Sequence, residues 1–220
     1  MSQNKALGVG LGFTAGYVDT LGFVSLFGLF TAHVTGNFVL IGSELARPSH
    51  GVLIKFLAFP SFVGAVALTR MIVIWLERQG KTPLRTLLAV QIAFLAAFML
   101  LGYLALPIQS TDALLALLAG MAGAAAMGVQ NAASKLAFSD IAPTTVMTGN
   151  VTQLVIDLVD ILRGSADAAV RGRMAKFLWP IVAFGLGAIA GAYAYLYAHF
   201  WALLLPIAIL GWFAATDQGA

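Results

Sequence analysis

The chain has 220 residues, of which 60% are hydrophobic and only 10% charged, and its mean hydropathy is +0.93. Because a soluble domain carries about a quarter charged residues, these values exclude an ordinary soluble protein. The sequence contains no cysteine, which excludes disulfides and thiolate metal sites. Its net charge of +3 comes from Lys and Arg beside apolar segments and does not indicate nucleic-acid binding.

Apolar runs rather than alternating residues dominate the sequence, so we expect an all-α polytopic membrane bundle and not a barrel. Six runs are taken as full spans, the last one short. They are residues 6–30, 52–76, 86–106, 114–138, 177–197 and 201–215. Loops are expected at residues 47–51, 77–85, 107–112, 139–147 and 163–176. The N-terminus lacks a small-residue cleavage site and is interpreted as a retained first span.

Two shorter segments, residues 30–46 and 148–162, carry the same pattern of Thr-Gly-Asn, six residues and a carboxylate. The first copy is Thr35, Gly36, Asn37 and Glu44, and the second is Thr148, Gly149, Asn150 and Asp157. In a helix each Asn and its acid lie on one face, two turns apart. A polar triplet with Gly inside an apolar chain predicts a broken or re-entrant half-helix. Its two copies predict two repeats, about residues 6–106 and 114–215, within one membrane domain of residues 1–220.

The repeat extends beyond the triplets, since Gly16-Tyr-Val-Asp19 matches Gly128-Val-Gln-Asn131. Orientation follows from Lys and Arg. One side receives Lys5, Arg78, Lys81, Arg85, Arg163, Arg171, Arg173 and Lys176, whereas the other receives only Arg47 and Lys55. Both termini are therefore predicted to be cytoplasmic; if the triplet segments spanned fully, the bias would be weaker. Three spans per half make an inverted 3+3 repeat, as in many secondary transporters, with a site near the midplane.

The start of each half-helix is the predicted solute site, because free amide N–H groups and the positive helix end attract anions. Side chains of both repeats would hold a small polar or anionic solute: Thr35, Asn37, Gln130, Asn131, Thr148 and Asn150. The alternative is that the triplets are N-caps of interfacial helices.

Asp19 lies midway along the first span, where an ionised carboxylate costs a few kcal/mol. It is predicted to be a proton or cation site, with Lys135 as a second cavity charge; alternatively it pairs statically with Lys135 or Arg70. Glu44 and Asp157 are interpreted mainly as interfacial acids near Arg47 and Arg163. His33 has no counterpart in the second repeat and is interpreted as a structural residue, although it could titrate near neutral pH.

Four motifs, at residues 16–19, 33–37, 127–131 and 144–150, resemble those of the YoaK-like family of small bacterial inner-membrane proteins. The resemblance covers nearly the whole chain. It implies a multi-pass bacterial inner-membrane protein with about six helices, and it implies no catalytic or binding residue.

The leading functional hypothesis is a secondary transporter in a lipid bilayer, and small size suggests a homodimer. The alternative is a non-transporting scaffold or partner subunit whose polar residues join helices. We expect no enzyme activity, cofactor or metal, because the sequence lacks a nucleophile elbow, a His-Glu-x-x-His helix and a phosphate-binding Gly loop with Lys.

Overall fold

The computed structural model describes residues 3–46, 51–110, 112–138, 141–165 and 167–216. These ranges contain helices and no strand, which confirms the all-helical prediction. In chain order the helices are α1 (Gln3–Ser25), α2 (Gly36–Ala46), α3 (Val52–Glu77), α4 (Leu84–Leu104), α5 (Leu114–Leu136), α6 (Met147–Leu162), α7 (Ala168–Ala198), the 3-10 turn η1 (His199–Leu203) and α8 (Leu204–Thr216).

Five stretches within these ranges are long and apolar enough to cross a membrane, by length and composition. Four of them are α1, α3, α4 and α5, and the fifth is the 49-residue stretch Ala168–Thr216, which joins α7, η1 and α8. The sequence predicted six spans, with the last two as separate helices. The structure gives five stretches because α8 has only 13 residues and is counted together with α7 and η1. A multi-pass membrane helical bundle follows from these stretches.

The expected loop at residues 163–176 is wrong for most of its length. α7 begins at Ala168, and the Asp167 side chain caps it by accepting the backbone N–H of Val170 at 2.9 Å. Arg171, Arg173 and Lys176 therefore lie on the first turns of a helix. Their charges suggested a loop, but an N-cap followed by ordinary helix formers is sufficient to start a helix.

Glycine reverses the chain after α1 and after α6. Gly28 has φ +77°, and its N–H donates to the Phe23 carbonyl at 2.9 Å. Gly164 has φ +72°, and the N–H of the next residue, Ser165, donates to the Asp160 carbonyl at 3.1 Å. These bonds satisfy last-turn carbonyls in the manner of a Schellman motif, which needs a residue in the left-handed region. The turn at Gly28 sends the chain back toward α1.

The two most enclosed helices are α1 and α5, with 67% and 72% of their apolar windows buried. α1 packs along α7, α5 packs along α3 and α4, and α8 contacts α1 and α4. Two close approaches repeat: a Cβ on Gly16 would overlap the Phe184 carbonyl oxygen, and one on Gly128 would lie 2.7 Å from the Phe62 carbonyl oxygen. Small residues permit such backbone contact where apolar attraction between helices is weak.

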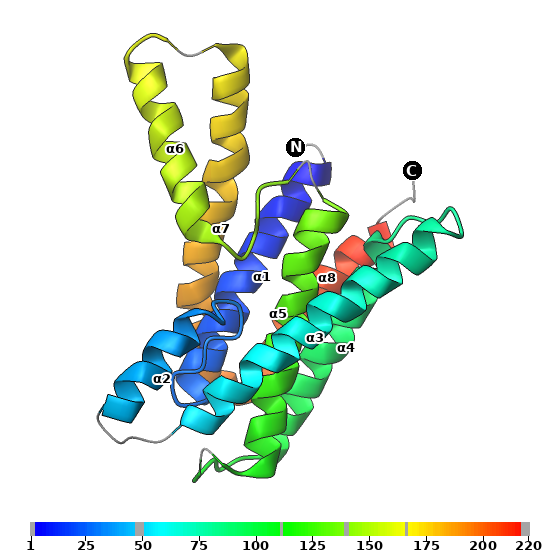
Figure 1. The fold of residues 1–220 in the computed structure, drawn as a ribbon, viewed down its shortest axis with the longest axis vertical. Coiled ribbons are helices and arrows are strands. Elements are labelled where there is room, and N and C mark those ends of the chain that lie inside the picture. The colour runs from blue at the N-terminus through cyan, green and yellow to red at the C-terminus, as the bar shows by residue number, and fades with distance from the viewer. Residues whose placement is uncertain (1–2, 47–50, 111, 139–140, 166, 217–220) are drawn as a thin grey trace.

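The half-helices run in opposite directions (Figure 1). α2 starts near mid-height and runs toward the lower end, whereas α6 starts near mid-height and runs toward the upper end. α6 and the first part of α7 form a hairpin that projects beyond the other helices, and both chain ends lie in the upper half. The predicted ends of the two triplet helices, residues 46 and 162, are confirmed, and α6 starts within one residue of its predicted start. The predicted start of α2 is wrong, because this helix begins at Gly36 rather than at residue 30.

Candidate functional site

Asp19 is buried in the last two turns of α1, which ends at Ser25 rather than at residue 30, and it is bound by the segment that precedes α2. Its Oδ1 accepts the backbone N–H of Ala32 at 2.7 Å, and its Oδ2 lies 2.6 Å from Nδ1 of His33. The Thr31 hydroxyl and the His33 N–H add longer bonds of 3.4 Å to Oδ1. Backbone donors, a hydroxyl and an imidazole thus share the two oxygens of the carboxylate.

The expected partners of Asp19 are wrong. Lys135 is exposed at the end of α5, and Arg70 is half exposed with its Nη1 3.9 Å from Glu77 on its own helix. His33 takes the place of both, although the sequence favoured a structural role for it. The signal that could have found it is the turn at Gly28, which brings residue 33 back to residue 19.

His33 faces the second half of the chain. Its ring centroid lies 5.7 Å from that of Phe184 on α7 and 6.0 Å from that of Phe30, both edge-on, and its side chain is 38% exposed. An imidazole can gain and lose a proton near neutral pH. The Asp19–His33 pair is therefore buried on the Asp19 side and partly accessible on the His33 side.

Asn37 closes the loop before α2 instead of lining an open cavity. Its Nδ2 donates to the Phe30 carbonyl at 2.8 Å, and its Oδ1 accepts the Phe30 N–H at 2.9 Å. Asn150 makes the matching bond seven residues back, from Nδ2 to the Pro143 carbonyl at 2.6 Å. Proline has no N–H, so the second bond is impossible in the second repeat. Both Asn side chains hold the starts of the half-helices in place.

Thr35 directly precedes α2 and Thr148 is the second residue of α6, and both side chains are exposed. A Cβ on Gly149 would meet nothing within 4 Å, so the backbone at the start of α6 is also open. Of the predicted solute residues in the triplets, the structure therefore leaves the two threonines accessible and buries the two asparagines.

Gln130 is fully buried and joins three parts of the fold. Its Nε2 donates to the Leu11 carbonyl at 2.8 Å and to the Thr144 hydroxyl at 3.0 Å, while its Oε1 accepts Nε2 of Gln91 at 2.7 Å. The neighbouring Asn131 is partly buried, and its Nδ2 donates to the Thr145 hydroxyl at 2.6 Å. These two predicted solute residues thus bond to the segment that precedes α6. Neither makes a described hydrogen bond to Asn37.

Glu44 is not a surface acid. Its Oε1 accepts Nζ of Lys55 at 2.7 Å, with side chains only 14% and 1% exposed, and Lys55 also donates to the Phe27 carbonyl at 2.7 Å. Oε2 of Glu44 is buried without a hydrogen-bond partner. The suggested partner Arg47 lies outside the described residues. This pair ties α2 to α3.

Asp157 makes the corresponding tie between α6 and α7. Its side chain is fully buried, and Nη2 of Arg173 donates to it at 2.7 Å, with Gln153 Nε2 at 2.8 Å on the same oxygen. The Arg173 guanidinium holds the pKa of the Asp157 carboxyl, which lies outside the five apolar stretches, below its usual range. The expected neighbour Arg163 is replaced by Arg173, because the residues of the assumed loop are helical.

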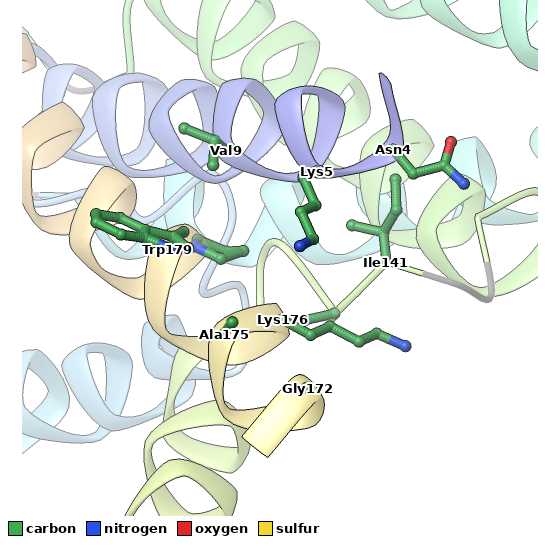
Figure 2. A pocket seen from close by; sticks show the side chains of 11 residues that line it. Asn4, Lys5, Val9, Ile141, Gly172, Ala175, Lys176 and Trp179 are labelled. Atoms are coloured by element: carbon green, nitrogen blue, oxygen red, sulfur yellow. The ribbon is translucent and has the colours of Figure 1, made fainter. Parts of the chain in front are cut away.

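Two hollows lie beside α1 and α7. One, of about 310 Å³, is lined at the upper end by Asn4, Lys5, Lys176 and Trp179 among others (Figure 2). The other, of about 630 Å³, is an apolar groove between α1, α7 and α8. Neither is lined by a residue of the Thr-Gly-Asn triplets. The described ranges contain no group of three His, Asp or Glu residues arranged to hold a metal ion.

Comparison with known proteins gives a family match over most of the chain. The family described as "Protein of unknown function (DUF1275)" matches residues 7–216. A curated relative, the UPF0700 transmembrane protein YoaK of Bacillus subtilis (strain 168), is 29% identical over 150 residues, which is 66% of this chain and 63% of the relative. The match thus spans somewhat less than two thirds of the relative's length. No solved structure matches. The resemblance inferred from the four motifs is confirmed.

Proposed function

We propose that this chain, which belongs to the DUF1275 family of proteins of unknown function, is a proton-coupled secondary transporter of a small polar or anionic solute. It would lie in a bacterial inner membrane with both termini cytoplasmic. The observation that carries the proposal is the Asp19–His33 pair, at 2.6 Å, between the last turns of the apolar helix α1 and the segment before α2, and against Phe184 of the other half. Ionisable groups inside a membrane bundle usually mark ion or proton pathways.

Contacts that recur in the two halves support this proposal, because an inverted repeat would produce them. α1 is the first helix of the first half and packs on α7, the third helix of the second half. In the same way α5, the first helix of the second half, packs on α3, the third helix of the first half. Gly16 against Phe184 is repeated by Gly128 against Phe62, and the bond from Asn37 by that from Asn150. Half-helices that start at mid-height and run in opposite directions match the discontinuous helices of inverted-repeat transporters.

The solute would bind where the half-helices begin. The exposed hydroxyls of Thr35 and Thr148 would contact it, and the positive end of each helix dipole favours negative charge. The amides of Gly36, Asn37 and Phe38 already donate to backbone carbonyls three residues earlier, so the free amides expected from the sequence are not found at the start of α2. Asn37 and Asn150 hold these turns in position, and Gln130 and Asn131 support the second one. Asp19 and His33 would couple solute movement to protons, because this titratable pair touches Phe184 of the other half.

The test uses proteoliposomes that contain a pH-sensitive dye, challenged with small anions and amino acids. Asp19→Asn keeps the shape and the acceptor for Ala32, so it should fold and lose solute-driven proton movement by at least about tenfold. His33→Gln should do the same. Glu77→Gln, an exposed acid on α3, is the matched control and should leave proton movement unchanged. Unaltered coupling in Asp19→Asn would rule out the proton site.

A second candidate is a non-transporting scaffold or partner subunit, and one observation favours it. The bonds from Gln91 to Gln130 and from Gln130 to Thr144 link helices through polar groups that satisfy one another. Such bonds contribute about 1 kcal/mol each to helix association. For a scaffold, Asp19→Asn would lower thermal stability, and the wild-type protein would show no solute-dependent proton movement with any probe.

A further inference from the structure

The two hollows beside α1 and α7 differ in chemistry. We call the first the basic hollow; its polar lining comes from Asn4 and Lys5 of α1 and Lys176 of α7, with Trp179 at its edge (Figure 2). We call the second the apolar groove; Phe13, Leu186 and Trp212 are among its lining residues, all of them apolar or glycine. The lysines place positive charge at the first hollow, whereas the second offers only apolar surface. The first therefore suits an anion and the second a hydrocarbon chain.

The two hollows adjoin. Val9 of α1 lines both. On α7, Lys176, Trp179, Ala183 and Leu186 follow at intervals of three or four residues, so they form one continuous stripe that passes from the first to the second. The charged opening lies at the end of the molecule that holds the N-terminus, and the groove continues from it toward the middle.

We propose that these two hollows form one binding site for an anionic phospholipid. Lys5 and Lys176 contact its phosphate, Asn4 donates from its amide, and an acyl chain lies along the groove against α8. Basic pockets between helices on the cytoplasmic side suit anionic headgroups, and Trp residues prefer the headgroup level, a place that the half-exposed Trp179 at the edge of the hollow would suit. The site is independent of the proposed transport path, with which it shares no residue.

The other half of the chain supplies an internal comparison. A hollow of about 370 Å³ lies between α3, α4 and α5, the equivalent elements, and includes Gly64, Phe94 and Met121. Its lining contains no Lys or Arg. The lining of the apolar groove likewise contains no Lys or Arg, so the headgroup site depends on the lysines of the basic hollow.

The headgroup is tested by native mass spectrometry of the full chain in detergent with equal amounts of phosphatidylglycerol and phosphatidylcholine. Wild type should retain phosphatidylglycerol in preference. Because a basic residue near a surface contributes about fivefold to anionic lipid affinity, Lys5→Gln with Lys176→Gln should reduce the preference by at least about tenfold. Arg78→Gln with Lys81→Gln, exposed charges in the α3–α4 connection, removes equal charge and should leave it unchanged. A preference that survives the first pair, or falls equally with the second, would overturn the proposal.

The part of the site that would hold the acyl chain is tested separately. Ala208→Trp fills the groove from α8 and should weaken phosphatidylglycerol retention, whereas Ala93→Trp, at an exposed position of α4 outside the described hollows, should not. Inorganic phosphate at millimolar concentration should fail to displace the lipid, because it lacks the acyl chain. If phosphate displaces it, or if Ala208→Trp has no effect on a monodisperse sample, the occupant is not a phospholipid held by both hollows.

Discussion

At the scale of single residues, the polar side chains of the apolar helices fall into two groups. Asn37, Asn150 and Gln130 use their hydrogen bonds on backbone groups or on neighbouring polar side chains, whereas His33 and Asp19 bond to each other. A buried amide that closes a loop stabilises the fold and does no chemistry. The titratable pair is thus where function is expected, and the amides are where stability is expected.

The two loop-closing asparagines should differ in their contribution to stability. Asn37→Ala leaves both the N–H and the carbonyl of Phe30 without partners, whereas Asn150→Ala leaves only the Pro143 carbonyl. At about 1–3 kcal/mol per unsatisfied group, Asn37→Ala should lower the melting temperature in detergent about twice as much. Thermal unfolding of both variants measures this, and an equal or larger loss for Asn150→Ala would contradict the assigned bonds.

At the scale of helices, contact between backbones decides the packing of α1 on α7. A Cβ on Gly187 would overlap the Phe13 carbonyl oxygen, and one on Gly191 the Tyr17 carbonyl oxygen. Together with Gly16 these residues form a seam in which each glycine faces a carbonyl. Any side chain in that seam separates the two helices.

Gly187 and Gly185 form a matched pair on α7. Gly187→Ala should destabilise the protein by about 1–3 kcal/mol, the usual cost of overpacking. A Cβ on Gly185 meets nothing within 4 Å, so Gly185→Ala should be neutral or stabilise by up to about 1 kcal/mol, since Ala is the better helix former. Unfolding of the two variants in the same detergent compares them, and similar stabilities would show that α1 and α7 do not approach as described.

The α6–α7 hairpin depends on the ion pair between Asp157 and Arg173. Arg173→Gln leaves a fully buried carboxylate without its cation, which is costly. Because α6 packs mainly on α7, hydrogen exchange should rise in α6 while α5 stays protected. Arg171→Gln, two residues earlier and exposed, should leave exchange unchanged. A uniform rise across all helices would mean that the pair stabilises the whole bundle.

At the scale of the whole molecule, the path of the chain sets which loops share a face. Both ends of the chain lie in the upper half, and α2 and α6 leave mid-height in opposite directions (Figure 1). In a bilayer, non-helical backbone at that depth is tolerated where protein or a water-filled cavity surrounds it. Here α1 and His33 cover the start of α2, which permits a re-entrant segment.

Single-cysteine labelling can test this path, because the sequence contains no cysteine. Cysteines at Gly80 and Gly164 should be modified from the same side as the N-terminus, and cysteines at Ala46 and Ser110 from the opposite side. Ala46 is the deciding position, since a fully spanning α2 would put it with the N-terminus. Labelling of intact cells with a membrane-impermeant thiol reagent, with and without lysis, makes the comparison.

The positions of most helices follow from the local amino-acid sequence. Apolar length predicted the helices, and the Thr-Gly-Asn triplets predicted where α2 and α6 begin, because span length and helix starts depend on neighbouring residues. The tertiary structure alone decided the partners. Asp19 meets His33 rather than Lys135, and Asp157 meets Arg173 rather than Arg163, because a left-handed turn and an unexpected helix start bring distant side chains together. Charge and composition show which residues need a partner in an apolar chain, but only the path of the backbone determines which partner is within reach.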